Sequence, residues 1–387
     1  MPFSAEFDPG EIADALERVP PDTNERRRLV LESGVRTLED AASLIAPASD
    51  DALERLAQAA HAVGASRFGS AIGLYAPLYL SNECVCTCTY CGFSMGLDIR
   101  RRTLTVDEVV REARLLADEG FRNILLVSAE HPKRVPVEHV ARCIRETKRL
   151  AGYVGIEIAA AEEEDYRAYA AAGCDAVVLY QETYDPQAFA RHHLGGPKKK
   201  YAWRLDAPER AARAGVRHLG IGALLGLSDW RFEALALVQH ARWLEKHCWR
   251  SQVNVSLPRI NPAAGDFVAP NPVGDRDFVH MLCFLRVALP TAGIFLSTRE
   301  RPELRDRLVT LGVTHMSAGS STEPGGYADP GAAGEQFELE DRRSPAAVAA
   351  RLRELGYDPV FKDWEVMTAE HDRASSNSTL AGSAVPT

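Results

Sequence analysis

The amino-acid sequence predicts an α/β protein built as a (β/α)8 barrel of the TIM type, with a helical extension before the barrel and a helical segment after it. Two observations predict this class: short apolar runs alternate with longer amphipathic segments, and the apolar runs number eight. Parallel strands need crossover helices, and eight consecutive βα units close into a barrel without a free edge. A length of 387 residues suits one such barrel with additions at both ends.

Four segments follow from this pattern. The charged, helix-rich residues 1–70 form the N-terminal extension, with Asp51 to Ala62 as its clearest amphipathic stretch. Residues 71–320 carry the alternating strands and helices of the barrel. Residues 321–369 form a C-terminal segment that closes it. Residues 370–387 are polar, simple in composition and free of aromatic side chains, so we expect a disordered tail there.

The apolar runs are short and β-rich, as expected of strands buried on both faces. We predict strands at Ile72 to Leu80, Asn123 to Val127, Val154 to Ala159, Ala176 to Tyr180, His218 to Leu224, Gln252 to Leu257, Gly293 to Ser297 and Val313 to Met316. The first intervening helix begins after Thr105, which forms a capping box with Glu108. We predict helices at Val106 to Glu119, Val137 to Leu150, Glu162 to Ala171, Pro208 to Ala214, Trp230 to Lys246, Asp275 to Ala288, Pro302 to Leu308 and Ser344 to Leu355.

The composition describes a folded, mildly acidic chain, because 45 Lys and Arg against 54 Asp and Glu give a net charge of −9 and 46% of the residues are hydrophobic. This balance argues against a nucleic-acid binder, since such proteins concentrate basic residues against phosphates. We interpret the one notable basic run, Lys198 to Lys200, as a solvated loop. No apolar stretch approaches the ~18 residues of a membrane span, and the first ten residues do not resemble a signal peptide. We therefore expect a cytoplasmic protein.

The eight cysteines are unevenly distributed, and four of them lie between positions 84 and 91. Cys84-x3-Cys88-x2-Cys91 directly follows the first predicted strand, at the barrel end where enzymes of this fold carry their chemistry. In a long chain of a reducing compartment, such a group indicates metal or cofactor binding rather than disulfides. Three thiolates at this spacing can hold three irons of a [4Fe-4S] cluster and leave the fourth iron open for a small molecule.

A structural zinc site is the alternative, with Cys86 as a fourth ligand. Four thiolates within eight residues would crowd a single ion, so we assign the metal to Cys84, Cys88 and Cys91 and interpret Cys86 as a bystander. The remaining cysteines stand in apolar contexts, where free cysteine usually acts as a small hydrophobic side chain.

Polar and charged residues follow six of the predicted strands. They are Glu130, Gln181 with Glu182, Ser228 with Asp229, Arg259, Arg299 and Ser317. Because the carboxyl ends of barrel strands meet at one face, this repetition points to a polar site there.

The cysteine spacing, with Tyr90 just before the third cysteine, identifies the chain as a member of the radical S-adenosylmethionine (SAM) superfamily. From about Arg36 to Trp364 the chain resembles the 2-iminoacetate synthases, the tyrosine lyases of thiamine biosynthesis. The segments that carry this resemblance are Leu78 to Asn82, Tyr90 to Ser94, Tyr180 to Tyr184, Gly222 to Asp229, Leu296 to Glu300, Pro324 to Tyr327 and Lys362 to Trp364.

The resemblance implies that the open iron of a [4Fe-4S] cluster binds SAM, whose reductive cleavage gives a 5′-deoxyadenosyl radical. In this family the radical takes a hydrogen from the amino group of L-tyrosine, and the Cα–Cβ bond breaks to give 2-iminoacetate (dehydroglycine) and p-cresol. The resemblance also implies a flavodoxin- or ferredoxin-type reductant, and a thiazole synthase that receives the 2-iminoacetate.

An amino-acid substrate brings a carboxylate into a largely dry cavity, where a guanidinium is its best partner. We expect Arg299 to fill this role, and the resemblance implies the same, with Ser317 and Tyr79 beside the amino-acid head. It further implies that Glu130 binds the ammonium of SAM. The remaining implied SAM contacts are Glu182 and Arg204 at the ribose or carboxylate and Tyr90 at the adenine.

Three departures from the family pattern bear on these assignments. Ala129 precedes Glu130 where the family has glycine, Ala159 to Ala161 replace the usual Gln-Pro-Leu, and Glu83 stands before the first cysteine. They leave tryptophan or another aromatic amino acid open as the substrate, and also a non-catalytic iron–sulfur protein. A related hydrogenase-maturation lyase would carry a second cysteine trio, whereas no cysteine follows Cys283.

Overall fold

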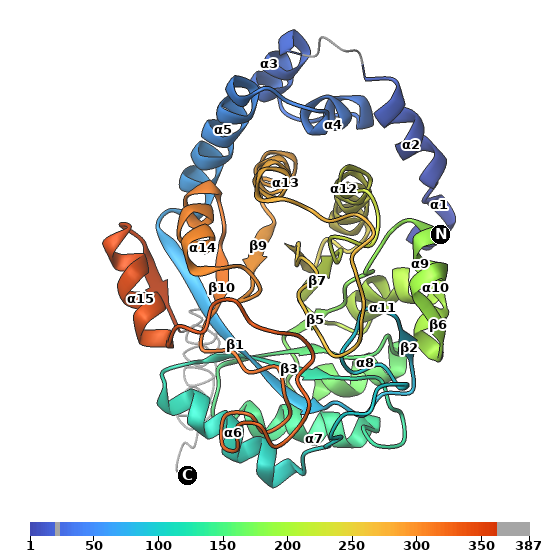
Figure 1. The fold of residues 1–387 in the computed structure, drawn as a ribbon, viewed down its shortest axis with the longest axis vertical. Helices are drawn as coiled ribbons and strands as arrows, with labels where there is room; N and C mark the ends of the chain where they lie inside the picture. Colours follow the sequence, from blue (N-terminus) through green and yellow to red (C-terminus); the bar gives the residue numbers. More distant parts are fainter. Residues whose placement is uncertain (20–23, 362–387) are drawn as a thin grey trace, which may run out of the picture.

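A computed structural model describes residues 1–19 and 24–361 of the chain. Its centre is a closed barrel of eight parallel strands, which confirms the predicted fold class (Figure 1). The barrel strands in chain order are β1 (Ala71–Ser81), β3 (Asn123–Ser128), β4 (Tyr153–Glu157), β5 (Ala176–Val178), β7 (His218–Gly222), β8 (Gln252–Ser256), β9 (Gly293–Leu296) and β10 (His315–Ser317). Every strand predicted from periodicity is present, and the pairing of β10 with β1 closes the ring.

Helices cover the outside of the barrel and agree with the predictions to within three residues at each end. They are α6 (Val106–Asp118), α7 (Val137–Thr147), α8 (Glu163–Ala171), α11 (Ala207–Arg213), α12 (Trp230–His247), α13 (Asp275–Ala288), α14 (Pro302–Leu308) and α15 (Pro345–Glu354). The Thr105 capping box before α6 forms as the sequence predicts, with Glu108 completing it.

The N-terminal helices arch over one side of the barrel, outside α12 and α13 (Figure 1). They are α1 (Phe3–Glu6), α2 (Pro9–Glu17), α3 (Asn24–Ser33), α4 (Leu38–Ile45) and α5 (Asp50–Phe68). The buried guanidinium of Arg27 donates to the carbonyls of Ser43, Ala46 and Pro47, which fixes α3 against the end of α4. This side of the barrel is therefore shielded from solvent by a second layer of helices.

Periodicity did not predict a small antiparallel ribbon that joins β2 (Thr87–Cys88) to β6 (His193–Gly195). The ribbon attaches the cysteine loop to a segment about a hundred residues later, together with α9 (Pro186–His192), η1 (Pro197–Lys199) and α10 (Tyr201–Leu205). Neither Thr87–Cys88 nor His193–Gly195 is an apolar run, so the pattern that predicted the barrel strands gives no signal for the ribbon.

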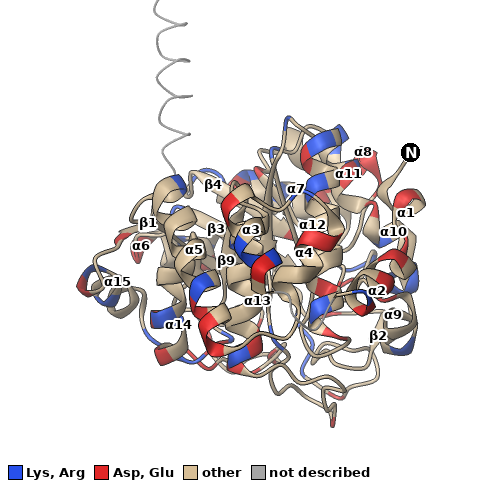
Figure 2. Cartoon of the chain, turned by 90° about the horizontal axis from the view of Figure 1, so that it is seen from above, with Lys and Arg blue, Asp and Glu red and all other residues tan. Residues whose placement is uncertain are grey.

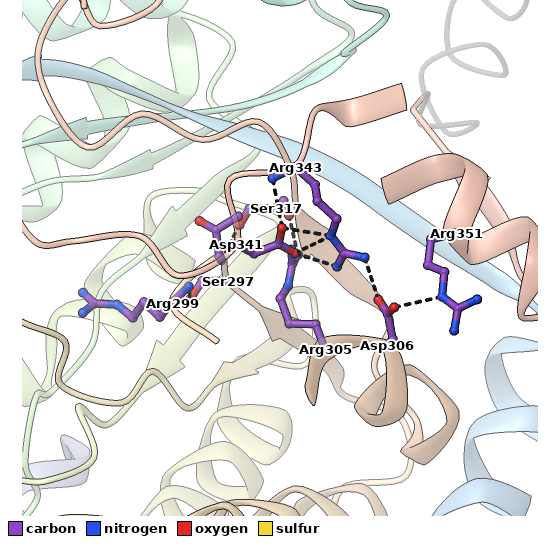
Figure 3. A network of polar contacts seen from close by, with 9 residues as sticks. Ser297, Arg299, Arg305, Asp306, Ser317, Asp341, Arg343 and Arg351 are labelled. Carbon is purple, nitrogen blue, oxygen red and sulfur yellow. Dashed lines mark hydrogen bonds and ion pairs between the residues drawn. The ribbon is translucent and has the colours of Figure 1, made fainter. Parts of the chain in front are cut away.

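A buried ionic network joins the end of β10 to the C-terminal segment (Figure 3). Arg305 on α14 has a side chain with no exposed surface, and it binds the carboxylate of Asp341 and the carbonyl of Ser317. Arg343 bridges Asp341 and Asp306, and Arg351 on α15 binds Asp306 as well. The network holds the irregular segment before α15 against the carboxyl end of the barrel.

Replacing Asp341 by alanine is expected to lower the free energy of unfolding by about 3–5 kcal/mol, because the Arg305 guanidinium would stay buried without its carboxylate. Denaturant unfolding of the anaerobically purified protein measures this. Glu354→Ala is the matched control, because it removes the exposed ion pair with Arg351 and should cost less than about 1 kcal/mol. Equal losses in the two variants would contradict a structural role for the buried network.

Charge is distributed without strong segregation, since Figure 2 shows acidic and basic side chains interspersed over the outer helices. Among the described helices, none combines the length and the hydropathy needed to cross a bilayer. The final strand, β11 (Asp358–Val360), adds to the edge of β1 near the amino end of the barrel. The predicted tail, residues 370–387, lies outside the described residues, and the division of the chain into four segments stays a prediction.

Candidate active site

A cavity opens at the carboxyl end of the barrel strands and contains about 930 Å³ of non-atom space, its solvent-filled mouth included. The functional candidates that line it, with the other polar and aromatic side chains used below, are Tyr75, Tyr79, Tyr90, Cys91, Glu157, Tyr180, Glu182, Lys198, Arg299, Ser317, Gln336 and Phe337. The cysteine loop and the predicted carboxylate-binding residue therefore face one shared space.

The three candidate ligand cysteines differ in how readily they form thiolates. The backbone N–H of Cys86 donates to Cys84 Sγ, and that of Phe93 donates to Cys91 Sγ, both at 3.4 Å. A hydrogen bond from the Cys86 side chain also lowers the pKa of Cys84 to about 6. Burial raises the pKa of Cys88 to about 12 and raises that of Cys91, while the charge of Lys198 opposes both shifts. These two thiols need a bound metal to lose their protons near neutral pH.

The donor set fits an iron–sulfur cluster better than one ion. Within the described residues, no three His, Cys, Asp or Glu side chains converge closely enough to hold a single metal ion. Tyr79, Phe93 and Val127 form an apolar wall against which Cys84 and Cys91 pack. Hydrogen bonds to sulfur and an apolar wall are the features by which proteins tune such clusters. Cys84, Cys88 and Cys91 are the residues that would hold it.

Cys86 belongs to the cysteine loop, between Cys84 and Cys88. It is 1% exposed and packs against the ribbon segment, where a Cβ on Gly196 would come within 2.7 Å of the Cys86 sulfur and backbone. Gly196 also has a φ of 82°, so both the backbone conformation and the close approach to Cys86 require glycine there. The close approach brings the next residues, including Lys198, toward the cavity.

Lys198 corrects the interpretation of the basic run as a solvated loop. Lys199 and Lys200 are exposed, but Lys198 lines the cavity, where its Nζ lies 2.6 Å from Glu182 Oε1. Arg204 Nη2 lies 3.2 Å from the same oxygen. Burial alone would raise the pKa of Glu182, but Lys198 and Arg204 outweigh it and hold this pKa at about 2. Glu182 is therefore ionised and shared between two cations.

Glu182 also has strained backbone. It has a φ of 73°, and no other non-glycine residue in the described part of the chain has a positive φ. Strain of this kind persists only where the surrounding contacts impose it, and it is common at functional sites. The two cations and a backbone bridge to Ala223 supply such contacts.

Tyr90 is oriented by the ribbon. Its hydroxyl lies 2.8 Å from His193 Nε2, and His193 Nδ1 lies 2.8 Å from the carbonyl oxygen of Phe189. Because that carbonyl can only accept, His193 carries its proton on Nδ1 and accepts from Tyr90. The Lys198 ammonium lies 5.7 Å from the centre of the Tyr90 ring. One polar corner thus contains Tyr90, Glu182 and Lys198, with Arg204 behind Glu182.

The opposite side of the cavity holds the three residues predicted for the amino-acid head. The Arg299 guanidinium stacks 3.3 Å from the centre of the Phe337 ring, and its Nη1 donates to the Arg259 carbonyl at 3.3 Å. Ser317 Oγ accepts from the Thr298 N–H at 3.0 Å and also contacts the Tyr75 hydroxyl. Tyr79 donates to Gln336 Oε1 at 2.6 Å. Figure 3 shows Arg299 pointing away from the buried ionic network, so that its charge is not neutralised there.

Several polar residues predicted at strand ends lie away from the cavity lining. Arg259 binds Glu300 and Asp275 instead, and Ser228 donates to Asp185. Asp229 caps the start of α12. Glu130 lies beside the cysteine loop, where its carbonyl accepts from the Val85 N–H at 2.9 Å.

Besides Lys198, the cavity residues that sequence reasoning missed are Glu157, Gln336, Phe337, Tyr75 and Tyr180. Alternation along the first and fourth strands could have placed Tyr75 and Tyr180 inside the barrel, because inward positions repeat every second residue. Gln336 and Phe337 belong to an irregular segment that folds over the cavity, and no local pattern marks them.

Comparison with known proteins agrees with this geometry. Residues 78–237 match the radical SAM superfamily, and residues 256–358 match the Biotin and Thiamin Synthesis associated domain. The 2-iminoacetate synthase of Escherichia coli K12 is 40% identical over 336 residues, which cover 87% of this chain and 89% of that protein. The Salmonella typhimurium enzyme of the same name is 40% identical over 84% of this chain and 87% of that protein.

The chain belongs to the 2-iminoacetate synthase family. It is a radical SAM enzyme, and radical SAM enzymes use a [4Fe-4S] cluster and SAM. Among solved structures, HydG, a maturase of the [FeFe]-hydrogenase, superimposes with a TM-score of 0.89 at 32% identity, covering 93% of this chain and 81% of that one. The resemblance inferred from the motifs is therefore confirmed, whereas the role of each site residue stays a prediction.

Glu182 is a predicted SAM contact. Lys198→Met is therefore expected to raise KM for SAM by about 10- to 100-fold, because Glu182 loses a charged hydrogen bond, worth about 1.5–3 kcal/mol, that holds it in position. Steady-state formation of 5′-deoxyadenosine at varied SAM concentration measures this. Lys199→Met is the matched control, since its side chain lies outside the cavity and is exposed. An equal change in both variants would mean that Lys198 does not act on the SAM site.

Proposed function

We propose that this protein is a tyrosine lyase that cleaves the Cα–Cβ bond of L-tyrosine to 2-iminoacetate and p-cresol, for the thiazole of thiamine. The observation that carries this proposal is that one cavity is lined both by the cysteine loop and by Arg299 with Ser317. The cluster and SAM would supply the radical that takes a hydrogen atom from the substrate amino group. The relatives at 40% identity bear the name of this activity.

The chain's own residues bind and orient the two small molecules. Arg299 holds the substrate carboxylate, and Ser317 and Tyr79 lie beside the amino group. Tyr90, Glu182, Lys198 and Arg204 form the corner for SAM. Glu130, beside Cys84, is the proposed partner of the SAM ammonium.

The segment after β10 excludes water from the cavity. Gln336 and Phe337 reach over the cavity from this segment, and Tyr327 fastens it to the barrel by donating to the Pro77 carbonyl at 2.6 Å. The Gln336 carbonyl also accepts from the Gly92 N–H, so the segment meets the cysteine loop directly. A covered cavity protects a reactive radical from side reactions.

We also propose two partner proteins, a low-potential reductant of the flavodoxin or ferredoxin type and a thiazole synthase that takes the unstable 2-iminoacetate. The acidic net charge of −9 does not select between them.

Anaerobic reconstitution with iron, sulfide, SAM and dithionite, followed by incubation with each aromatic amino acid in turn, tests the function. We expect 5′-deoxyadenosine and p-cresol with tyrosine, and little cleavage with the others. Indole-derived products would instead assign the enzyme to tryptophan. Absence of turnover with every aromatic amino acid, by a protein that has assembled its cluster, would make it an iron–sulfur binding protein.

A further inference from the structure

Glu157 is a cavity residue to which the proposed function assigns no role. It is the last residue of β4 and lines the same cavity as Arg299. Arg299 follows β9, and β4 and β9 are four strands apart in either direction around the barrel. The two side chains therefore enter the cavity from opposite walls.

The carboxyl group of Glu157 has no polar partner of its own. In the described part of the chain its side chain makes no hydrogen bond, and no cation lies within ion-pair distance of it. The nearby phenols are engaged elsewhere: Tyr79 donates to Gln336, Tyr75 interacts with Ser317, and Tyr180 interacts with Ser256. A carboxyl group that faces a cavity without a partner is unfavourable unless a ligand completes its hydrogen bonding.

The electrostatic surroundings leave Glu157 able both to donate and to accept. Burial, with the nearby Glu182 carboxylate, raises its pKa to about 7, against the opposing charges of Arg299, Lys198 and Arg204. Near neutral pH the group is present in both protonation states, so it can pair with a hydroxyl in either direction.

We infer that Glu157 recognises the phenolic hydroxyl of the substrate, which lies across the cavity with its carboxylate on Arg299 and its ring directed toward β4. This inference rests on the proposed function and extends it to substrate selection. The walls next to Glu157 suit the ring, because Leu125 and Val127 of β3 are apolar and Val127 pairs directly with Glu157. The polar end of the substrate thus meets Arg299, and its distal hydroxyl meets the one unpartnered carboxyl group on the far wall.

Recognition of this kind explains how the site would select tyrosine among aromatic amino acids. A site built to hydrogen-bond a substrate hydroxyl rejects an analogue that lacks it, since its own polar group is then left unpaired. Phenylalanine fits the same apolar walls but leaves Glu157 without a partner. Discrimination between these two amino acids is therefore the direct readout of the Glu157 contact.

The test compares Glu157→Leu and Glu157→Gln with the unaltered enzyme, each with its cluster reconstituted and SAM bound. Isothermal titration gives Kd for L-tyrosine and L-phenylalanine, and product formation gives kcat and KM. In Glu157→Leu, we expect the preference for tyrosine over phenylalanine to fall by roughly 10- to 100-fold, the range set by a hydrogen bond to a charged group. Glu157→Gln, which keeps a donor and an acceptor, should recover part of it.

Glu164→Leu is the matched control, because Glu164 is an exposed glutamate on α8 that pairs with Arg167, and it should keep the full preference. If Glu157→Leu weakens the binding of tyrosine and of phenylalanine equally, the residue acts through Arg299 and the inference is wrong. The inference also fails if the preference is unchanged in a variant that binds tyrosine. Failure of the proposed function is distinct, because then the unaltered enzyme itself would form no p-cresol from tyrosine.

Discussion

Cys88→Ala enzyme, purified and reconstituted without oxygen, is expected to form no more 5′-deoxyadenosine than a sample without enzyme. Cys88 stands in the middle of the cysteine loop, on the β2 side of the ribbon, and is 5% exposed. Two remaining thiols cannot hold three irons, so the cluster would be lost rather than weakened. Iron and sulfide analysis with the visible absorption spectrum would report this independently of turnover.

Cys248→Ala provides the control, because this cysteine lies at the end of α12, outside the loop, and should leave iron content unchanged. The assignment would fail if Cys88→Ala retained full iron and SAM cleavage. It would also fail if oxygen-free unaltered protein bound only zinc.

Arg299→Ala is expected to lower kcat/KM for tyrosine by about a thousandfold, which corresponds to ~4 kcal/mol of lost transition-state stabilisation. The substrate carboxylate would then enter a buried site without the guanidinium proposed to bind it. Arg299→Lys keeps the charge but not the planar fork, so its loss should be smaller, about 10- to 100-fold.

The two steps of the reaction separate the binding role from a structural one. Slow SAM cleavage by dithionite in the absence of tyrosine should survive in Arg299→Ala, whereas stimulation by tyrosine should disappear. Arg301→Ala is the control, since this exposed neighbour pairs with Asp275 outside the cavity. An Arg299→Ala enzyme that binds tyrosine as tightly as the unaltered one would contradict the assignment.

The barrel could be predicted from the sequence because each barrel strand is part of a short apolar run that alternates with amphipathic helical segments. Asn123 to Ser128, for example, is an apolar run that ends on a polar residue, and a capped helix precedes it. The cysteines could be assigned from spacing, and Arg299 from the charge that an amino-acid carboxylate requires. Each of these features depends on a few adjacent residues, so it can be predicted without knowledge of the fold.

Lys198 could not be predicted because nothing local distinguishes it from Lys199 and Lys200. Its inward position follows from the pairing of β6 with the cysteine loop and from the contact between Gly196 and Cys86. Both contacts join residues about a hundred positions apart. The strand that carries Glu157 was predicted correctly, but the role of Glu157 was not. Only the closed ring of strands shows that this residue lies across the cavity from Arg299.

The β2–β6 ribbon has a consequence for protein engineering. Thr87 and Cys88 pair with Gly195 and His193. The cysteine loop is therefore held in place by the segment that carries Lys198, one of the residues proposed to bind SAM. Grafting the three-cysteine motif alone onto another barrel would transfer the metal ligands but leave behind His193 and Lys198. A portable version of this module must therefore include both halves of the ribbon.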